Sequence, residues 1–386
     1  MLERQDTTRF LKEHWQKTPS FMPKVMDAQL PQLSPGELAW LATLPDVESR
    51  LVFTDRNGDD IRYRVETGPF DDAALSGLPE RNWTLLVHDV EKHLPDFRAY
   101  LALVDFIPDW RIDDLMVSCA APGGSVGPHV DNYDVFLCQG EGTREWAIGY
   151  PGEFEVDAKT ECLSLVKPFD TSADYKAGIG DVLYLPPRIS HWGIASELCT
   201  TYSIGCRAPS RRELELAQER VLGKTLSEGC ESSEPVLYSD PDLSVTEALS
   251  GCIDANTLRR IREQRLLDAS LGDVELARIV GCAVSDPKAW LMPEPIDEDT
   301  FDRVLGNPAG LEVHGMARLA WIDIGEHQRV FVNGADREIN GQELKLVRQL
   351  STERRLDMAS VLPEEHQALL VWLAREGLFD AGQAQE

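Results

Sequence analysis

The sequence predicts an α+β protein with three parts: a β-rich domain, a helical region and a small module of mixed helices and strands. From about residue 111 to 208, short apolar or alternating runs are separated by Gly and Pro, which is typical of a β-barrel or a sandwich. From about residue 210, apolar residues recur at the spacing of amphipathic helices. After about residue 285, the pattern of two helices, strands and two more helices indicates a winged-helix-like module. The predicted parts are therefore residues 1–208, 209–284 and 285–386.

The first 110 residues are predicted to combine helices with a hairpin. TTRFLKEHWQK favours a helix, and SPGELAWLATL favours a second helix with Ser34 as its N-cap and Pro35 at its first position. RLVFTDRNGDDIRYRVE predicts a hairpin around Asn57 and Gly58, a dipeptide that supplies the positive φ angles of a tight turn. In WTLLVHDVEKHLPDFRAYLALVDF, apolar residues lie three and four apart, so this stretch is predicted to be helical.

The later elements are predicted from two patterns: apolar residues three and four apart for helices, and short apolar or alternating runs for strands. Strands are predicted in DDLMVSCAAPGGSVGPH, YDVFLCQG, REWAIGY, GDVLYLPPRISHWGI and TTYSIGCRAP. Helices are predicted in SRRELELAQERVLGK and ALSGCIDANTLRRIREQRLLDASL, with a turn-rich loop over residues 227–244 between them. In the last part, strands are predicted in GMARLAWIDIGEHQRVFVNGADREI, and helices in GQELKLVRQL and PEEHQALLVWLAREGLF.

The charge of the chain limits its partners. Acidic residues outnumber basic ones by 66 to 38, which gives a formal net charge of -28. Direct binding to nucleic acid is therefore not expected, because a phosphate backbone requires clustered Lys and Arg. The charge favours a basic protein partner, whose encounter it would accelerate, although acidity also serves solubility alone. The acidic winged-helix-like module is predicted to pack or to bind protein.

Cysteine spacing and hydropathy indicate the compartment. The eight cysteines include no C-x-x-C pair, so neither a zinc knuckle nor a dense disulfide framework is indicated. The N-terminus has no apolar signal region, and no run of about 20 apolar residues could span a bilayer. The sequence therefore predicts a soluble, unprocessed protein of the cytoplasm with no membrane partner.

A possible metal site lies in the β-rich domain. His129 and Asp131 in GGSVGPHVDNYDVFLCQG are two residues apart, so on a strand their side chains project to the same side. His191 follows the apolar strand of GDVLYLPPRISHWGI, and barrel closure can bring it to the same point. Two histidines and one carboxylate form a facial triad, which favours Fe(II) over four-coordinate structural zinc. The alternatives are a chance His-x-Asp pair and a core histidine at 191.

These residues resemble a known family, the cupin-fold JmjC-type 2-oxoglutarate oxygenases, and among them the bacterial ribosomal oxygenases. The similarity is carried by EHWQKTP, IPDWRIDDLMVS, GGSVGPHVDNYDVFLCQG, GDVLYLPPRISHWG and YSIGCRAP. It implies a double-stranded β-helix over residues 1–208, a helical dimerisation region over 209–284 and a winged-helix-like domain over 285–386. It also implies Fe(II), 2-oxoglutarate and O₂ as cofactor and cosubstrates, a homodimer, and hydroxylation of an arginine at the β-carbon in a basic large-subunit ribosomal protein.

The resemblance also assigns residues around the metal. Arg144 falls at the position of the basic residue that binds 2-oxoglutarate, and its planar fork can grip a carboxylate through two hydrogen bonds. Surface pairing, or packing against Trp146, is the alternative for Arg144. Asp114 and Met116 lie two apart on a predicted strand and can offer a carboxylate and an apolar wall to a substrate arginine.

Two further substrate positions rest on the resemblance alone. Tyr133 and Ser203 match positions that line the substrate pocket in the family. The alternatives are a capping or turn role for Asp114, a core role for Met116 and barrel filling by Tyr133. Two other functions also stay open: a cupin-fold oxygenase acting on a histidine or lysine of another protein, and a non-catalytic acidic scaffold that binds ribosomal proteins.

Overall fold

The computed structural model describes residues 4–58, 60–157, 165–223, 235–245, 250–297, 300–301, 310–356 and 363–380. Its contacts divide the chain into a first unit, Met1–Val104 with Ile112–Arg207, and a second unit, Asp105–Arg111 with Ala208–Glu386. The cysteines in the described ranges are free and buried. None of the described helices combines the length and apolar character needed to cross a lipid bilayer.

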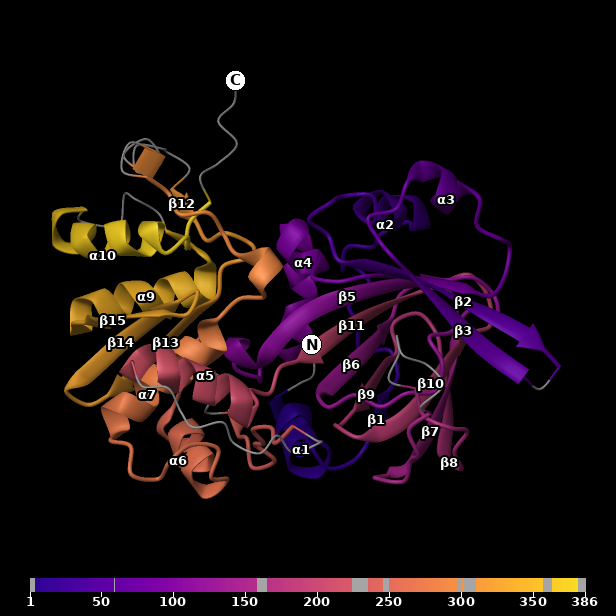
Figure 1. Ribbon diagram of the computed structural model, residues 1–386, viewed down its shortest axis with the longest axis horizontal. Helices are drawn as coiled ribbons and strands as arrows, with labels where there is room; N and C mark the ends of the chain where they lie inside the picture. The colour runs from indigo at the N-terminus through magenta and orange to yellow at the C-terminus, as the bar shows by residue number, and fades with distance from the viewer. Residues whose placement is uncertain are drawn as a thin grey trace. The chain divides into compact units, whose positions relative to one another are not determined.

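The first unit is built from two antiparallel sheets (Figure 1). In the described residues the larger sheet has, in spatial order, β1 (Ser20–Met22), β9 (Val182–Leu185), β6 (Asp134–Gln139), β11 (Cys199–Cys206), β5 (Ile112–Ala120), β4 (Trp83–Val87), β2 (Ser49–Asn57) and β3 (Asp60–Thr67). The smaller sheet has the order β10 (Ile189–Ala195), β7 (Arg144–Pro151) and β8 (Thr171–Ala177). The helical elements are α1 (Arg4–Glu13), α2 (Pro35–Leu41), α3 (Asp72–Ser76), α4 (Val90–His93) and the 3₁₀ helix η1 (Pro95–Val104).

One apolar core joins the two sheets. Leu137 of β6 and Leu183 of β9 pack with Trp146 and Ile148 of β7 and with Ile189 before the bend of β10. Because side chains alternate between the faces of a strand, these residues define the inner face of each sheet. The predicted β-rich domain is therefore confirmed as two antiparallel sheets that pack face to face.

The hairpin and the second helix form as predicted. Asn57 pairs with Asp60 across the turn of β2 and β3, and Gly58 has φ +63°. Ser34 caps α2: its side chain accepts from the Glu37 backbone N–H, and the Glu37 side chain accepts in return from the Ser34 N–H. This reciprocal pair satisfies two backbone donors that the first helical turn cannot use.

The helix predicted for residues 83–106 is wrong over its first part. Trp83–Val87 forms β4, which pairs with β2 on one side and β5 on the other. Only Val90–His93 is α-helical, and Pro95 begins a separate 3₁₀ helix, since proline cannot donate to a preceding turn. A short apolar run such as WTLLV fits a buried strand as well as a helix, so spacing alone could not separate them.

The second unit carries helices around a smaller set of strands. Its helical elements are η2 (Asp109–Arg111), α5 (Arg211–Leu222), α6 (Ala255–Glu263), α7 (Asp273–Ser285), η4 (Ala289–Leu291), α9 (Gly341–Glu353) and α10 (Pro363–Arg375). Its strands are β12 (Leu311–Glu312), β13 (Leu319–Ile324), β14 (His327–Val332), β15 (Ala335–Ile339) and β16 (Arg355–Leu356). The strands β13 to β15 and helices α5, α9 and α10 lie where they were predicted.

Some predicted elements of the second unit are shorter than expected. Among the described residues of ALSGCIDANTLRRIREQRLLDASL, those that form an α-helix belong to α6, which begins after its cap, Asp254. In the described residues 286–297, the helical part is η4 alone. The loop predicted over 227–244 lies partly outside the described residues. The boundary at residue 285 and the homodimer stay predictions.

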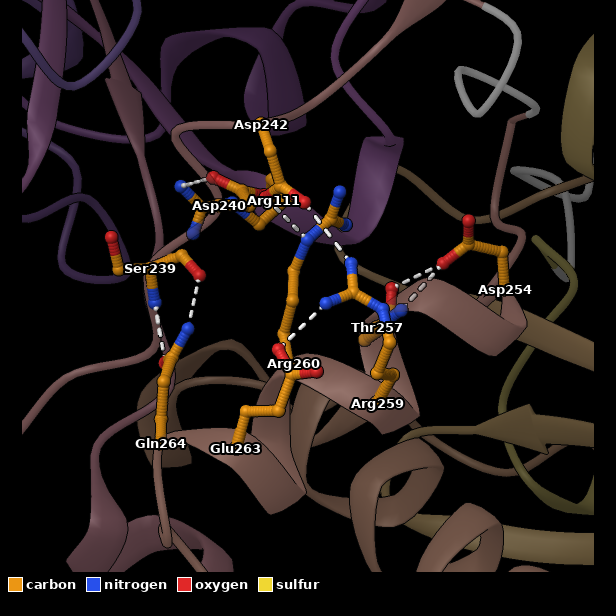
Figure 2. Close-up of polar contacts among 10 residues, drawn as sticks. All are labelled: Arg111, Ser239, Asp240, Asp242, Asp254, Thr257, Arg259, Arg260, Glu263 and Gln264. Carbon is orange, nitrogen blue, oxygen red and sulfur yellow. Dashed lines mark hydrogen bonds and ion pairs between the residues drawn. The ribbon is translucent and has the colours of Figure 1, made fainter.

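Charged side chains hold the segment 238–242 to the rest of the second unit (Figure 2). Arg111 Nη2 lies 3.2 Å from Asp240 Oδ1, and both side chains are buried, at 0% and 1% exposure. Arg260 of α6 donates from Nε to Asp242 at 2.8 Å, and Gln264 exchanges hydrogen bonds with the backbone of Ser239. A buried ion pair is costly to break, because the remaining charge stays out of water.

Asp240→Ala is therefore expected to lower the free energy of unfolding by about 3–5 kcal/mol, as loss of one partner of a buried pair does. Asp273→Ala is the matched control, because its pair with Arg262 is solvent-exposed and contributes little. Urea denaturation followed by tryptophan fluorescence measures both. Equal losses for the two variants would contradict a special role for the buried pair.

Candidate metal centre

The structure brings His129, Asp131 and His191 together. His129 lies between β5 and β6, and it pairs with His191 of β10 through two backbone hydrogen bonds of 3.0 and 2.9 Å. The backbone N–H of Arg188 donates to the carbonyl of Asp131 at 2.8 Å, which ties the loop of Asp131 to the turn before β10. One ligand atom from each of the three side chains lies within 4.8 Å of the others. Asp131 Oδ2 is 3.5 Å from His191 Nε2 and 3.9 Å from His129 Nε2.

Backbone carbonyls orient both imidazoles. His129 Nδ1 lies 2.9 Å from the carbonyl oxygen of Gly127, and His191 Nδ1 lies 2.9 Å from that of Ile189. Because a carbonyl can only accept, each Nδ1 carries the proton and donates it. Each Nε2 therefore presents a lone pair toward Asp131, which is the tautomer that a metal-ligating histidine needs.

Burial keeps His191 in the neutral form. The side chain is almost fully buried, and this burial, together with the nearby His129, lowers the pKa of His191 to about 4. A neutral imidazole is the form that binds a metal ion. His129 and Asp131 are only partly buried, so the open side of the cluster can accept further ligands. The donor set of two nitrogens and one oxygen fits an Fe(II) ion with open coordination positions.

Arg144 lies on the same inner surface as His191. Along the pair β7 and β10, Ile148 is opposite His191, Trp146 is opposite Gly193 and Arg144 is opposite Ala195. Arg144 is 5% exposed, and its Nε and Nη2 atoms have no hydrogen-bond partner among the described residues. Its guanidinium carbon lies 5.7 Å from the Trp146 ring centre, which in turn lies 6.0 Å from that of His191. A buried guanidinium whose donors are unused by the described residues has the chemistry to bind an anion.

Three of the four predicted substrate residues lie on two neighbouring strands of the larger sheet. Asp114 is opposite Gly205 and Met116 is opposite Ser203, so these side chains share one face of β5 and β11. Asp114 is 7% exposed and Ser203 is buried. Tyr133 precedes β6 and is 44% exposed. The charge of Asp131, followed by burial and the charge of Asp114, holds the pKa of the Tyr133 hydroxyl well above its usual range.

Comparison with known proteins agrees with this arrangement. Residues 100–214 match the family model of the JmjC domain, and residues 262–378 match that of the ROXA-like winged helix. A probable ribosomal oxygenase of Haemophilus influenzae is 31% identical over 369 residues, covering 91% of this chain and 87% of that protein. The chain belongs to the bacterial ribosomal oxygenases.

Other members of this ribosomal oxygenase family support the assignment. The ribosomal protein uL16 3-hydroxylase of Escherichia coli K12 is 39% identical over 239 residues, a match that spans 61% of this chain and 60% of that protein. The crystal structure of E. coli YcfD covers 96% of this chain and 97% of its own, with 29% identity and a TM-score of 0.73. YcfD in complex with cobalt and 2-oxoglutarate covers the same shares, with 30% identity and a TM-score of 0.70.

Two further residues of this ribosomal oxygenase border the site, and the sequence analysis did not single them out. Tyr63 of β3 lies against Gly127, where an added Cβ would come within 2.9 Å of the ring. Gly127 has φ +88°, so the glycine-rich approach to His129 reflects both this turn and the close packing of Tyr63. His88 contacts Asp114 from the end of β4. Neither residue belongs to a recognisable sequence motif. Strand pairing brings each of them to the site, and the sequence carries no local signal for that pairing.

Removal of any one ligand is expected to abolish tight metal binding by this ribosomal oxygenase. Titration calorimetry with Co(II) should give one site in the unaltered protein. Asp131→Ala and His191→Ala should each weaken it by roughly a hundredfold or more, because loss of even a supporting hydrogen bond costs about 10–100-fold. His327→Ala is the control, because His327 is exposed beside Glu338 in the second unit. Unchanged Co(II) affinity in Asp131→Ala would rule out this site.

Proposed function

We propose that this chain is an Fe(II)- and 2-oxoglutarate-dependent oxygenase that hydroxylates an arginine of ribosomal protein uL16 at the β-carbon. The observation that carries the proposal is the cluster of His129, Asp131 and His191 beside the buried guanidinium of Arg144. The E. coli relative named for uL16 3-hydroxylation, and the YcfD complex with cobalt and 2-oxoglutarate, support the same chemistry.

In the proposed site, His129, Asp131 and His191 would hold the metal ion. Bound Fe(II), with 2-oxoglutarate and O₂, supplies an oxidising power that no side chain provides. The protein's contribution is to fix the three ligands and to keep the reacting groups in one orientation. The two carbonyl-bound imidazoles serve this purpose, since neither ring can turn without losing its hydrogen bond.

Arg144 is proposed to bind the carboxylate of 2-oxoglutarate that lies away from the metal. A buried positive charge is unfavourable unless an anion accompanies it. The unused Nε and Nη2 donors suit a carboxylate, whose two oxygens can each accept one hydrogen bond. Trp146 lies between Arg144 and His191, so it can support one side of the cosubstrate. The alternative of a surface ion pair for Arg144 is disfavoured, because the side chain is buried.

Asp114, Met116, Tyr133 and Ser203 are proposed to receive the substrate arginine. The buried carboxylate of Asp114 suits a guanidinium, and Met116 can pack against the methylene groups that precede it. The net charge of -28 favours approach of a basic ribosomal protein. Asp114 also favours arginine over a neutral histidine. A non-catalytic scaffold would have no need for the ligand cluster or for the buried Arg144.

The reaction is tested by mass spectrometry of uL16 peptides incubated with the enzyme, Fe(II), 2-oxoglutarate and ascorbate. An arginine peptide should gain one oxygen atom, and Asp131→Ala should give no detectable product because the metal has lost a ligand. Peptides with lysine or histidine at the same place, and an assay for formaldehyde, separate hydroxylation of arginine from the other substrates and from demethylation. Product from Asp131→Ala would contradict the proposal.

Arg144→Ala is expected to raise the KM for 2-oxoglutarate at least about tenfold, since hydrogen bonds to charged groups contribute more than neutral ones. Arg144→Lys should fall between Arg144→Ala and the unaltered enzyme, because lysine keeps the charge but not the fork. Arg9→Ala is the control, because Arg9 is exposed and pairs with Glu13 on α1. Succinate formation at varied 2-oxoglutarate gives the constants, and an unaltered KM in Arg144→Ala would exclude the role.

A further inference from the structure

The segment that leads to His129 runs beside β10, and its backbone pairing with that strand is interrupted. Gly124 accepts from the N–H of Ala195 at 3.0 Å, near the end of β10. The next backbone pair along the segment is that of His129 with His191. Between these two pairs, the four residues 125–128 lie beside three residues of β10. An extra residue of this kind breaks the regular ladder, here directly before the first proposed ligand.

The hydroxyl of Ser125 bridges this interruption. Its Oγ accepts from the backbone N–H of Gly127 at 3.0 Å, and from the indole Nε1–H of Trp192 at 3.0 Å. Trp192 is the residue that follows His191 in β10. Ser125 is 1% exposed, so both hydrogen bonds are shielded from water. One buried side chain thus connects the segment before His129 to the strand that carries the other imidazole.

Gly127 transmits this constraint to the first imidazole. Its N–H is the group that Ser125 holds, and its carbonyl accepts from Nδ1 of His129 at 2.9 Å. Gly127 has φ +88°, and glycine has more conformational freedom than any other residue. Without a fixed N–H, the direction of its carbonyl would be less defined. The orientation of the His129 ring, which donates to that carbonyl, would then be less defined as well.

The hairpin of β2 and β3 fixes the backbone around Ser125. Thr54 of β2 is buried, and its hydroxyl donates to the carbonyl of Ser125 at 3.3 Å. Tyr63 of β3 is the cross-strand partner of Thr54, and its ring packs against Gly127. The backbone of Ser125 is therefore held independently of its side chain. Loss of the hydroxyl alone should leave this support in place.

We propose that Ser125 is a positioning residue of the metal centre, whose hydroxyl fixes Gly127 and Trp192 relative to each other so that His129 and His191 converge on one ion. This inference rests on the proposed function, since it names what holds two ligands of that site in place. Hydrogen bonds that support ligating histidines set the orientation of the rings and change metal affinity about 10–100-fold. A serine that only stabilised the fold would have no such effect on the metal.

Two variants test the bridge, and a third is their matched control. Ser125→Ala removes the hydroxyl with little change of volume, and Trp192→Phe removes the indole donor while keeping an aromatic ring. Ser285→Ala is the control, because Ser285 is also 1% exposed. Its hydroxyl donates to the carbonyl of Gly281 at 2.8 Å and accepts from the N–H of Gly334 at 3.2 Å, all within the second unit. Both serine variants therefore lose the hydrogen bonds of a buried hydroxyl.

The measurements separate positioning from stability. Thermal melting gives the loss of stability, and titration calorimetry gives the affinity for Co(II). The absorption spectrum of bound Co(II) reports the geometry of its ligands. In the metal-free protein, NMR of isotope-labelled histidine gives the Nδ1–H signal of His129, which is assigned by its loss in His129→Ala.

Ser125→Ala is expected to weaken Co(II) binding about tenfold and to change the Co(II) spectrum, as loss of a supporting hydrogen bond does. It should also shift the Nδ1–H signal of His129, because that proton is donated to Gly127. Trp192→Phe should weaken binding about threefold, because Ser125 then keeps its hydrogen bond to Gly127. Ser285→Ala should lower the melting temperature as Ser125→Ala does, but leave the Co(II) affinity, the spectrum and the histidine signal unchanged.

Unaltered Co(II) affinity in Ser125→Ala would overturn the inference, and so would an unshifted His129 signal. Equal losses of affinity in Ser125→Ala and Ser285→Ala would also overturn it, because the effect would then follow from stability alone. If Ser125→Ala does not fold, Trp192→Phe decides the question. Unchanged affinity and an unchanged Co(II) spectrum in that variant would show that the bridge does not position the ligands.

The same measurements separate this inference from the proposed function. If Co(II) binding depends on Ser125 as expected but uL16 peptides gain no oxygen, the positioning role stands and the proposed reaction fails. If the peptides are hydroxylated and Ser125→Ala binds Co(II) as the unaltered protein does, the positioning role fails and the proposed reaction stands. If the unaltered protein binds no Co(II), the proposed metal site fails. The His129 signal of the metal-free protein then decides the positioning role, which an unshifted signal in Ser125→Ala overturns.

Discussion

The site depends on one backbone contact, the reciprocal pair of hydrogen bonds between His129 and His191. These residues are far apart in sequence, and this pair joins the segment after β5 to a strand of the smaller sheet. The same residues carry the two imidazoles, so the backbone pairing that joins these two segments also brings two ligands of the cluster together. Two carbonyls then set the rings, and Asp131 completes the cluster from two residues away. A change that disturbs the pairing would therefore alter both fold and ligand geometry.

Much of this arrangement could be predicted from sequence, because the signals are local. The spacing of His129 and Asp131, the turn at Asn57 and Gly58, and the cap at Ser34 each depend on residues within a few positions. The position of Arg144 came from similarity to a family, and the structure adds that its guanidinium is buried with donors unused by the described residues. Local sequence patterns thus predicted individual helices, strands and turns. The family resemblance predicted which residues from these elements come together at the site.

The sequence could not predict features that arise only from strand pairing. β4 was mistaken for helix because a five-residue apolar run has no periodicity of its own, and its two neighbours in the sheet decide its form. The positions of His88 and Gly205 next to Asp114 could not be predicted from the sequence for the same reason. Each is unremarkable in its own segment, and each gains meaning because β4 and β11 flank β5 and bring both against Asp114. The register of strand pairing decides which residues become neighbours in a sheet, and the sequence alone does not specify that register.

Two of the buried arginines in the described residues, Arg111 and Arg144, differ in whether a carboxylate accompanies them. Arg111 is fully buried and faces Asp240, so the protein supplies the compensating charge itself. Arg144 is also buried, but among the described residues no carboxylate forms an ion pair with it, and its Nε and Nη2 meet no acceptor there. A buried charge without an anion is unfavourable, so binding of an anion at Arg144 is expected to stabilise the protein. The proposed substrate site at Asp114 has the opposite sign, because a buried carboxylate is unfavourable without an accompanying cation. In the proposed function, a dicarboxylate would neutralise Arg144 and a substrate arginine would neutralise Asp114.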